Sequence, residues 1–334
     1  ICSVSYKLLP SDVKIGGTIL VDDGLVEMEV VSKTNKEIKC FVKNNGVIKS
    51  NKGVNIPNEI INLPSITEKD KSDILFAIKN DLDFIAASFV RKPEDVYEIR
   101  KILDENNSEI KIISKIENQE GVENIDKIIE ASDGIMVARG DLGVEIKAEF
   151  IPKIQKEIIR KCNLVGKPVI TATQMLDSMI RNPRPTRAEL TDVCNAVFDM
   201  ADAVMLSGET TIGQYPVETV RYMKTLCKTS EANPDLMRKV LPYYGEDQIA
   251  STIARLANLA TEELEAKCII VPTTTGKTAV LLSTLRPNLK IVATCIDEKT
   301  ARFLSLAYGV SPIVVNKFDT IEEMIEGLSP IDIT

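Results

Sequence analysis

The sequence contains no histidine among its 334 residues. Acid–base catalysis by imidazole and metal sites built on histidine are therefore excluded within these residues. Catalytic chemistry has to come from lysine, arginine, carboxylates, hydroxyl groups and metal ions. No apolar run is long enough to span a membrane and no signal peptide opens the sequence, so we expect no membrane partner.

The sequence also lacks a disulfide or zinc pattern. Its seven cysteines are scattered and odd in number, with no C-x-x-C, which is typical of small buried thiols in a reducing cytoplasm. The net charge of −8 argues against a nucleic-acid partner. With 44% hydrophobic and 27% charged residues, the chain is expected to be a soluble protein of two or three domains.

The segment from 110 to 145 alternates between strand-like and helical patterns. An apolar run at 110–116 precedes apolar residues at helical spacing over 122–129. A second apolar run, 134–138, precedes a loop at 139–143 that contains two glycines. This order predicts strand, helix, strand and loop.

Charged residues stand where these two strands end. Lys115 and Glu117 close the first, and Asp141 follows the second. Because the carboxyl ends of parallel strands meet at one rim, we expect the three side chains to converge there. Two carboxylates with a lysine suit a Mg²⁺ that also holds an oxyanionic or phosphorylated substrate. The alternative, ordinary salt-bridged loop charges, explains less well why charges end apolar strands.

Residues 1–56 read as a small β module. Short β-rich runs at 18–21 and 25–31 flank an Asp-Asp-Gly turn as a hairpin, and 38–42 supplies another strand. Lys52, beside a glycine, is placed to reach a phosphate.

From residue 57 onward, strands and helices alternate as five successive βα units. A regular βα order predicts a parallel sheet, either a barrel or a doubly wound sheet. Polar residues end every strand, which favours the barrel, although five units do not close an eight-stranded barrel. The expected strands are 84–90, 110–116, 134–138, 168–174 and 203–206.

A second α/β region follows residue 234. A helix at 249–264, a strand at 268–272 and a helix from 279 flank the hydroxyl-rich turn 273–278. The turn is not a nucleotide P-loop, because Val271 stands where that motif requires glycine. Phosphate binding by its backbone N–H groups and plain helix capping both remain open.

The sequence contains the long motifs ISKIENQEG, MVARGDLGVE, TATQMLDSM, NPRPTRAE and MLSGET. With these motifs it resembles the pyruvate kinase family, and the match extends from VDDGL through NKGVNIP and ASFVRK to VPTTTGKTA. The resemblance implies a (β/α)₈ TIM barrel with an inserted small β-domain and a C-terminal α/β domain. It implies the later part of the β-domain at 1–62, barrel units four to eight at 63–233, and an incomplete effector domain at 234–334. The family's first three barrel strands have no counterpart, so we expect a longer chain.

The resemblance implies a glycolytic kinase that transfers the phosphoryl group of phosphoenolpyruvate to ADP. By motif, Glu117 and Asp141 would hold Mg²⁺ or Mn²⁺, and Lys115 would stabilise charge on the moving phosphoryl group and the enolate oxygen. Backbone N–H groups around Arg139, Gly140 and Asp141 would hold the substrate carboxylate. The family's K⁺ ligands have no counterpart in the sequence.

The resemblance also implies how the enolate is protonated. Thr173 lies where the family places a hydroxyl beside the enolate's methylene carbon, and Ser207 and Glu209 would belong to the same proton-delivery network. Ser88 would line the rim. In a histidine-free chain a hydroxyl–water relay is the natural acid.

Three further sites follow from the resemblance. Lys52, Asp22 and Asp23 would serve the nucleotide at the lid, and Arg187 would lie at a subunit contact of a homotetramer. A sugar phosphate or AMP would bind as effector at Thr273, Thr275, Gly276, Lys277 and Thr278.

Two other functions remain open: a sugar-phosphate-binding regulatory or assembly protein without turnover, and a Mg²⁺-dependent barrel lyase acting on an oxo-acid enolate.

Overall fold

The computed structural model describes residues 2–22, 24–50, 52–57, 66–233, 248–317, 320 and 322–323. The chain forms two compact units. The first comprises Ile1–Ser132, Met136–Ile158 and Ala172–Gln174, and the second Asp133–Ile135, Ile159–Thr171 and Met175–Thr334. No helix within the described ranges is both long and apolar enough to cross a membrane.

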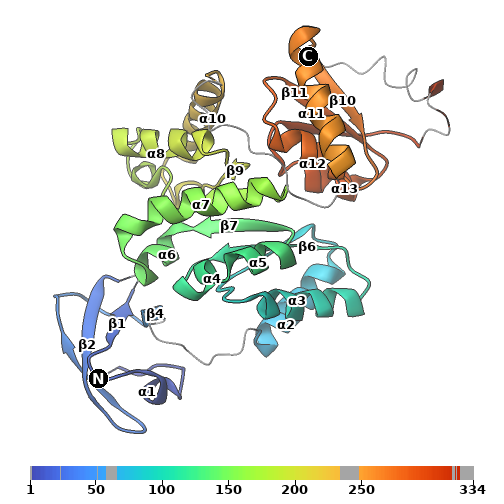
Figure 1. Ribbon diagram of the computed structural model, residues 1–334. Coiled ribbons are helices and arrows are strands. Elements are labelled where there is room, and N and C mark those ends of the chain that lie inside the picture. The colour runs from blue at the N-terminus through green and yellow to red at the C-terminus, as the bar shows by residue number, and fades with distance from the viewer. Residues whose placement is uncertain are drawn as a thin grey trace. The chain divides into compact units, whose positions relative to one another are not determined.

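The first unit begins with a small antiparallel sheet, and the predicted hairpin is confirmed. The strands lie in the order β3-β2-β1-β4, with the short helix α1 (Leu9–Asp12) beside them (Figure 1). Alternate residues such as Ile19 and Val21 are buried with Leu9 and Val13, as the two-residue period of a half-buried strand requires. The strand bounds are β1 Thr18–Val21, β2 Val26–Lys33, β3 Ile38–Val42 and β4 Val54–Asn55.

The five predicted strands of the main sheet are present in the order β5-β6-β7-β8-β9. The pairs β5–β6 and β8–β9 are parallel, and every residue of β7 is buried, as expected for a sheet covered on both faces. Three strands end earlier than predicted: β5 and β8 end directly before Ser88 and Thr173, and β9 ends at Val204, so Ser207 lies beyond the strand as predicted. The bounds are β5 Phe84–Ala87, β6 Lys111–Ile116, β7 Gly134–Ala138, β8 Val169–Ala172 and β9 Ala203–Val204.

Two local expectations in this region are wrong. The helix expected over 122–129 is divided at Asn124, whose side-chain amide donates to the Arg91 carbonyl oxygen at 3.0 Å. The loop expected at 139–143 is a helix, in which the N–H of Gly140 finds an acceptor in Thr173. The helices are α2 Glu68–Lys79, α3 Pro93–Glu105, α4 Gln119–Glu123, α5 Ile125–Ala131, α6 Arg139–Glu145, α7 Ile151–Leu164, α8 Arg187–Phe198, α9 Gly208–Thr211 and α10 Pro216–Glu231, with 3₁₀ turns at Ala148–Phe150 and Asp177–Ile180.

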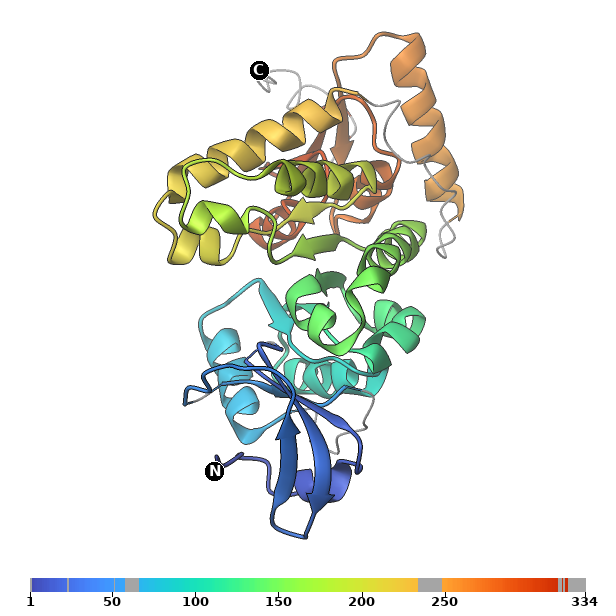
Figure 2. The same ribbon diagram turned by 90° about the vertical axis from the view of Figure 1, so that its left-hand side faces the viewer.

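The C-terminal part of the second unit is a three-stranded parallel sheet with helices beside it (Figures 1 and 2). Its core contains Leu282, Ile291 and Leu304. The sequence did not predict β12, which is only partly buried and contains a proline. The bounds are α11 Gln248–Glu263, β10 Cys268–Pro272, α12 Lys277–Thr284, β11 Lys290–Cys295, α13 Glu298–Leu304 and β12 Val310–Val314.

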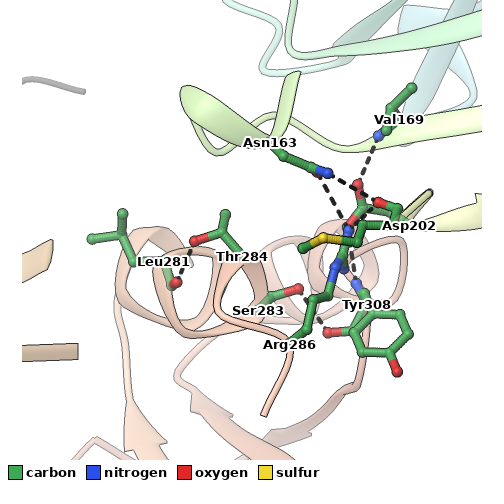
Figure 3. Close-up of polar contacts among 9 residues, drawn as sticks. Asn163, Val169, Asp202, Leu281, Ser283, Thr284, Arg286 and Tyr308 are labelled. Atoms are coloured by element: carbon green, nitrogen blue, oxygen red, sulfur yellow. Dashed lines mark hydrogen bonds and ion pairs between the residues drawn. The ribbon is translucent and has the colours of Figure 1, made fainter. Parts of the chain in front are cut away.

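Within the second unit, a buried arginine after α12 bonds to residues near the ends of α7 and α8 (Figure 3). Arg286 follows α12 with a left-handed φ of 49°, and its side chain is 3% exposed. Its Nη1 lies 2.9 Å from Oδ1 of Asp202, and Nη2 donates to the Met200 carbonyl oxygen and to Asn163. The guanidinium carbon lies 4.4 Å from the centre of the Tyr308 ring. These contacts give the guanidinium hydrogen-bond acceptors and a counter-charge, which offset the free-energy cost of burying it.

Candidate active site

The carboxyl end of β6 carries an ion pair. Lys115 lies near the end of β6 and Glu117 directly follows it, and Lys115 Nζ lies 2.5 Å from Oε1 of Glu117. Lys115 also donates to Ser88 Oγ at 3.0 Å. The N–H of Phe89, which has a left-handed φ of 54°, donates to Glu117 Oε2 at 2.7 Å. The sequence does not reveal the part played by Phe89, because a backbone donor leaves no signature in side-chain identity.

Glu117 is a fully buried carboxylate, 0% exposed. Burial raises its pKa above the ordinary value, and the charge of Asp141 adds to the rise, whereas Lys115 and the Phe89 N–H oppose it. Within the described ranges, Oε1 makes no hydrogen bond of standard geometry; Lys115 approaches it only as an ion-pair partner. A buried oxygen with spare lone pairs, within electrostatic reach of a second carboxylate, that of Asp141, is a chemical fit for Mg²⁺.

The two carboxylates suit Mg²⁺ better than they suit a metal whose ligands all come from the protein. Among the described residues, no group of three or more cysteine, aspartate or glutamate side chains converges. Mg²⁺ is commonly held by one or two carboxylates, with substrate oxygens and waters completing its octahedron. Glu117 and Asp141 are the two carboxylates available for that arrangement.

The start of α6 is bonded to the end of β8. The Thr173 hydroxyl accepts from the Gly140 N–H at 2.8 Å and donates to the Ala172 carbonyl oxygen at 2.6 Å. A Cβ on Gly140 would lie 3.4 Å from Thr173 Oγ1, so glycine permits this close approach. Thr173 and Gln174 both have left-handed backbones, with φ of 69° and 53°.

Arg139 holds this left-handed turn through its side chain. Its Nε donates to the Ala172 carbonyl oxygen at 3.2 Å and its Nη2 to the Thr173 carbonyl oxygen at 2.7 Å. A left-handed non-glycine residue costs about 1–3 kcal/mol, and a hydrogen bond from a charged donor contributes about 1.5–3 kcal/mol. The guanidinium is therefore strong enough to offset the strain.

Glu209 is a second buried carboxylate, 2% exposed, and belongs to the second unit. It accepts from the N–H of Ser207 at 2.8 Å and from the N–H of Leu176 at 3.2 Å. These bonds fix the carboxylate beside the backbone that carries the Ser207 hydroxyl.

Comparison with known proteins decides the family. The model of the pyruvate kinase barrel domain matches residues 1–220, and that of the pyruvate kinase alpha/beta domain matches 251–332. The pyruvate kinase of Clostridium acetobutylicum is 53% identical over 327 residues, covering 97% of this chain and 69% of the relative. The chain belongs to the pyruvate kinase family. Membership confirms the predicted fold class, and it assigns the chain the family's glycolytic role, phosphoryl transfer from phosphoenolpyruvate to ADP.

Two further relatives agree. The pyruvate kinase of Clostridium perfringens is 52% identical, with 97% of this chain and 70% of the relative covered. The crystal structure of a pyruvate kinase from Cryptosporidium parvum superposes with a TM-score of 0.88 at 45% identity, over 96% of this chain and 67% of that chain.

In this pyruvate kinase-family chain, the residues assigned to the nucleotide lie beside the small sheet. Lys52 Nζ lies 2.7 Å from Oδ1 of Asp22, whereas Asp23 lies outside the described residues. A contact that no sequence pattern predicted joins this sheet to α6: the Asn55 amide donates to Glu145 Oε1 at 3.0 Å. Burial raises the pKa of Glu145, and the bond from Asn55 opposes the rise.

The effector turn is shaped by glycine and threonine. Gly276 has a φ of 81°, and a Cβ there would lie 3.1 Å from Leu304. The Gly276 N–H donates to Thr273 Oγ1 at 3.0 Å, so the Thr273 hydroxyl stabilises the turn itself. The side chains of Thr275, Lys277 and Thr278 are exposed.

Arg187 is exposed as the first residue of α8. Thr186 and Glu189 form a capping box at the N-terminus of this helix, which the sequence did not predict. Burial alone would raise the pKa of Glu189, but hydrogen bonds from Ser178 and Thr186 together lower it.

Proposed function

We propose that Lys115, Glu117 and Asp141 form the charge centre at which this protein transfers the phosphoryl group of phosphoenolpyruvate. The supporting observation is the pair of Lys115 with the buried Glu117, whose Oε1 has no regular hydrogen bond among the described residues. Phosphoryl transfer depends on positioned positive charge more than on covalent chemistry. Lys115 faces the transferring group and stabilises its negative charge.

Glu117 and Asp141 hold the divalent cation, Mg²⁺ or Mn²⁺. When bound, the metal supplies charge neutralisation for the enolate and carboxylate oxygens of the substrate. The Phe89 N–H keeps the Glu117 carboxylate oriented at 2.7 Å. The family generally uses a divalent metal together with K⁺, and we extend both requirements to this protein.

The second half of the reaction delivers a proton to the enolate carbon. N–H groups at Arg139, Gly140 and Asp141 bind the substrate carboxylate, and the Thr173 hydroxyl faces the methylene carbon. For this the Gly140 N–H exchanges its bond to Thr173 Oγ1, and the Thr173 hydroxyl its bond to the Ala172 carbonyl oxygen, for the substrate. Ser207 and Glu209 serve the hydroxyl–water relay that resupplies Thr173. A positioned proton donor of this kind contributes about 10²–10⁴-fold to rate.

The regulatory and partner assignments belong to the same proposal. Lys52 and Asp22 act on the nucleotide phosphates, and Arg187 lies in a subunit contact of a homotetramer. A sugar phosphate or AMP binds the exposed turn around Lys277. The scattered thiols support a cytoplasmic location.

The direct test assays the purified protein with phosphoenolpyruvate, ADP, Mg²⁺ and K⁺, measuring pyruvate and ATP together. Equal amounts of the two products are expected. Mg²⁺-dependent turnover of an oxo acid that needs no ADP and forms no ATP would instead favour the lyase. Binding of a sugar phosphate with no turnover would favour the regulatory protein.

A further inference from the structure

The guanidinium of Arg139 faces the end of β8. It donates to two consecutive carbonyl oxygens, those of Ala172 and Thr173, at 3.2 and 2.7 Å. Gln155, which is 5% exposed, accepts from the same guanidinium at 3.5 Å. The side chain thus joins α6 and α7 to the turn that carries Thr173.

The same turn sets the direction of the Thr173 hydroxyl. Left-handed backbones at Thr173 and Gln174 bring Oγ1 within 2.8 Å of the Gly140 N–H. A β-branched residue adopts this conformation only where its surroundings impose it. Arg139 is the charged side chain that bonds both carbonyls flanking the Thr173 Cα.

We propose that Arg139 is a positioning residue for enolate protonation, acting through Thr173. The inference rests on the proposed function, in which Thr173 faces the enolate carbon. Lysine cannot replace arginine here, because the planar guanidinium bonds two acceptors in a fixed fork and an ammonium is a point charge. Arg139→Lys should therefore loosen Thr173 while keeping the positive charge.

The test follows exchange of the pyruvate methyl hydrogens with deuterium in D₂O, by NMR, in the full-length protein with ATP, Mg²⁺ and K⁺. In each event a C–H bond breaks, its electron pair becomes the enolate, and the proton leaves through the hydroxyl relay. A deuteron returns by the same route. Arg139→Lys should slow this exchange by about 100-fold, the lower end of what a positioned proton donor contributes.

Two readouts separate positioning from general damage. Arg139→Lys keeps the backbone N–H assigned to the substrate carboxylate, so Mn²⁺ affinity and the KM for phosphoenolpyruvate should stay within about twofold of the parent protein. Arg160→Lys, an exposed arginine of α7, is the matched control and should behave as the parent. A raised KM with unchanged exchange would overturn the inference, because Arg139 would then serve substrate binding.

A double-mutant cycle identifies the route of the effect. In a Thr173→Val background, Arg139→Lys should slow exchange no further, because the group it positions is gone. Additive losses would overturn the inference. If the parent protein makes ATP but Arg139→Lys exchanges normally, only the positioning role fails. If the parent protein neither makes ATP nor exchanges, the proposed function fails and this inference with it.

Discussion

Lys115 Nζ lies 2.5 Å from Oε1 of Glu117, a carboxylate with no exposed surface. The pair combines the cation suited to a phosphoryl group with an anion suited to a metal. Each partner also offsets part of the free-energy cost of removing the other's charge from water. Removing Lys115 should therefore change both catalysis and the titration of Glu117.

Lys115→Met should reduce kcat/KM for phosphoenolpyruvate by at least about 100-fold, near 3 kcal/mol of transition-state stabilisation. The loss follows from removing the charge that faces the phosphoryl group. The pKa of Glu117 should rise further, since its opposing cation is gone. Steady-state kinetics measure the first effect, with the exposed Lys127→Met as control. A loss below about 1 kcal/mol would rule out the assigned role.

Glu117→Gln should weaken Mn²⁺ binding by at least about tenfold, because a buried carboxylate ligand becomes a neutral amide. Titration followed by electron paramagnetic resonance measures free Mn²⁺ without any turnover. Glu123→Gln, at an exposed glutamate of α4, is the matched control. Equal affinities in the two variants would remove Glu117 from the metal site.

Lys277→Gln should weaken binding of a phosphorylated effector by roughly tenfold, the effect of losing one exposed charge near a phosphate. Calorimetric titration of fructose 1,6-bisphosphate, ribose 5-phosphate and AMP identifies which of them binds. Lys267→Gln, an exposed lysine outside the turn, serves as control. Absence of heat for all three compounds in the parent protein would count against the turn as an effector site.

Arg286→Met should lower the free energy of unfolding by about 3–5 kcal/mol, because Asp202 loses its buried partner. Arg286→Lys should fall between this variant and the parent, since it keeps the charge but not the fork. Thermal and denaturant unfolding measure the change. Arg221→Met, on the exposed side of α10, should have little effect. Equal stability of the Met variant and the parent would show that the cluster in Figure 3 is not stabilising.

Burial raises the pKa of Cys227 to about 11, and the charge of Glu231 adds to the rise. Because the thiolate is the nucleophile, about one Cys227 side chain in a thousand is reactive at any moment at pH 8, which slows alkylation in proportion. Alkylation by iodoacetamide should accelerate about tenfold for each pH unit up to pH 10. Mass spectrometry of the Cys227 peptide follows the rate, with denatured protein as reference. A plateau near pH 9 in the folded protein would contradict the raised pKa.

The sequence was sufficient for the order of strands and helices and for the residues at the rim. Apolar runs ending in charged or hydroxyl residues predicted β5 to β9, and turn residues predicted the hairpin of β1 and β2. These signals are local, since a buried strand must be apolar and a tight turn favours glycine. Local signals failed at 139–143, where two glycines suggested a loop.

Only the tertiary structure decided how those residues are held. The first turn of α6 donates to Thr173, which lies 33 residues from Gly140. Glu117 is oriented by the backbone of Phe89, and the guanidinium of Arg139 faces two carbonyl oxygens. Backbone donors and acceptors are common to nearly every residue type, so their pairing cannot be read from side-chain identity. The sequence by itself determined which chemical groups are available, and folding decided which backbone groups orient them.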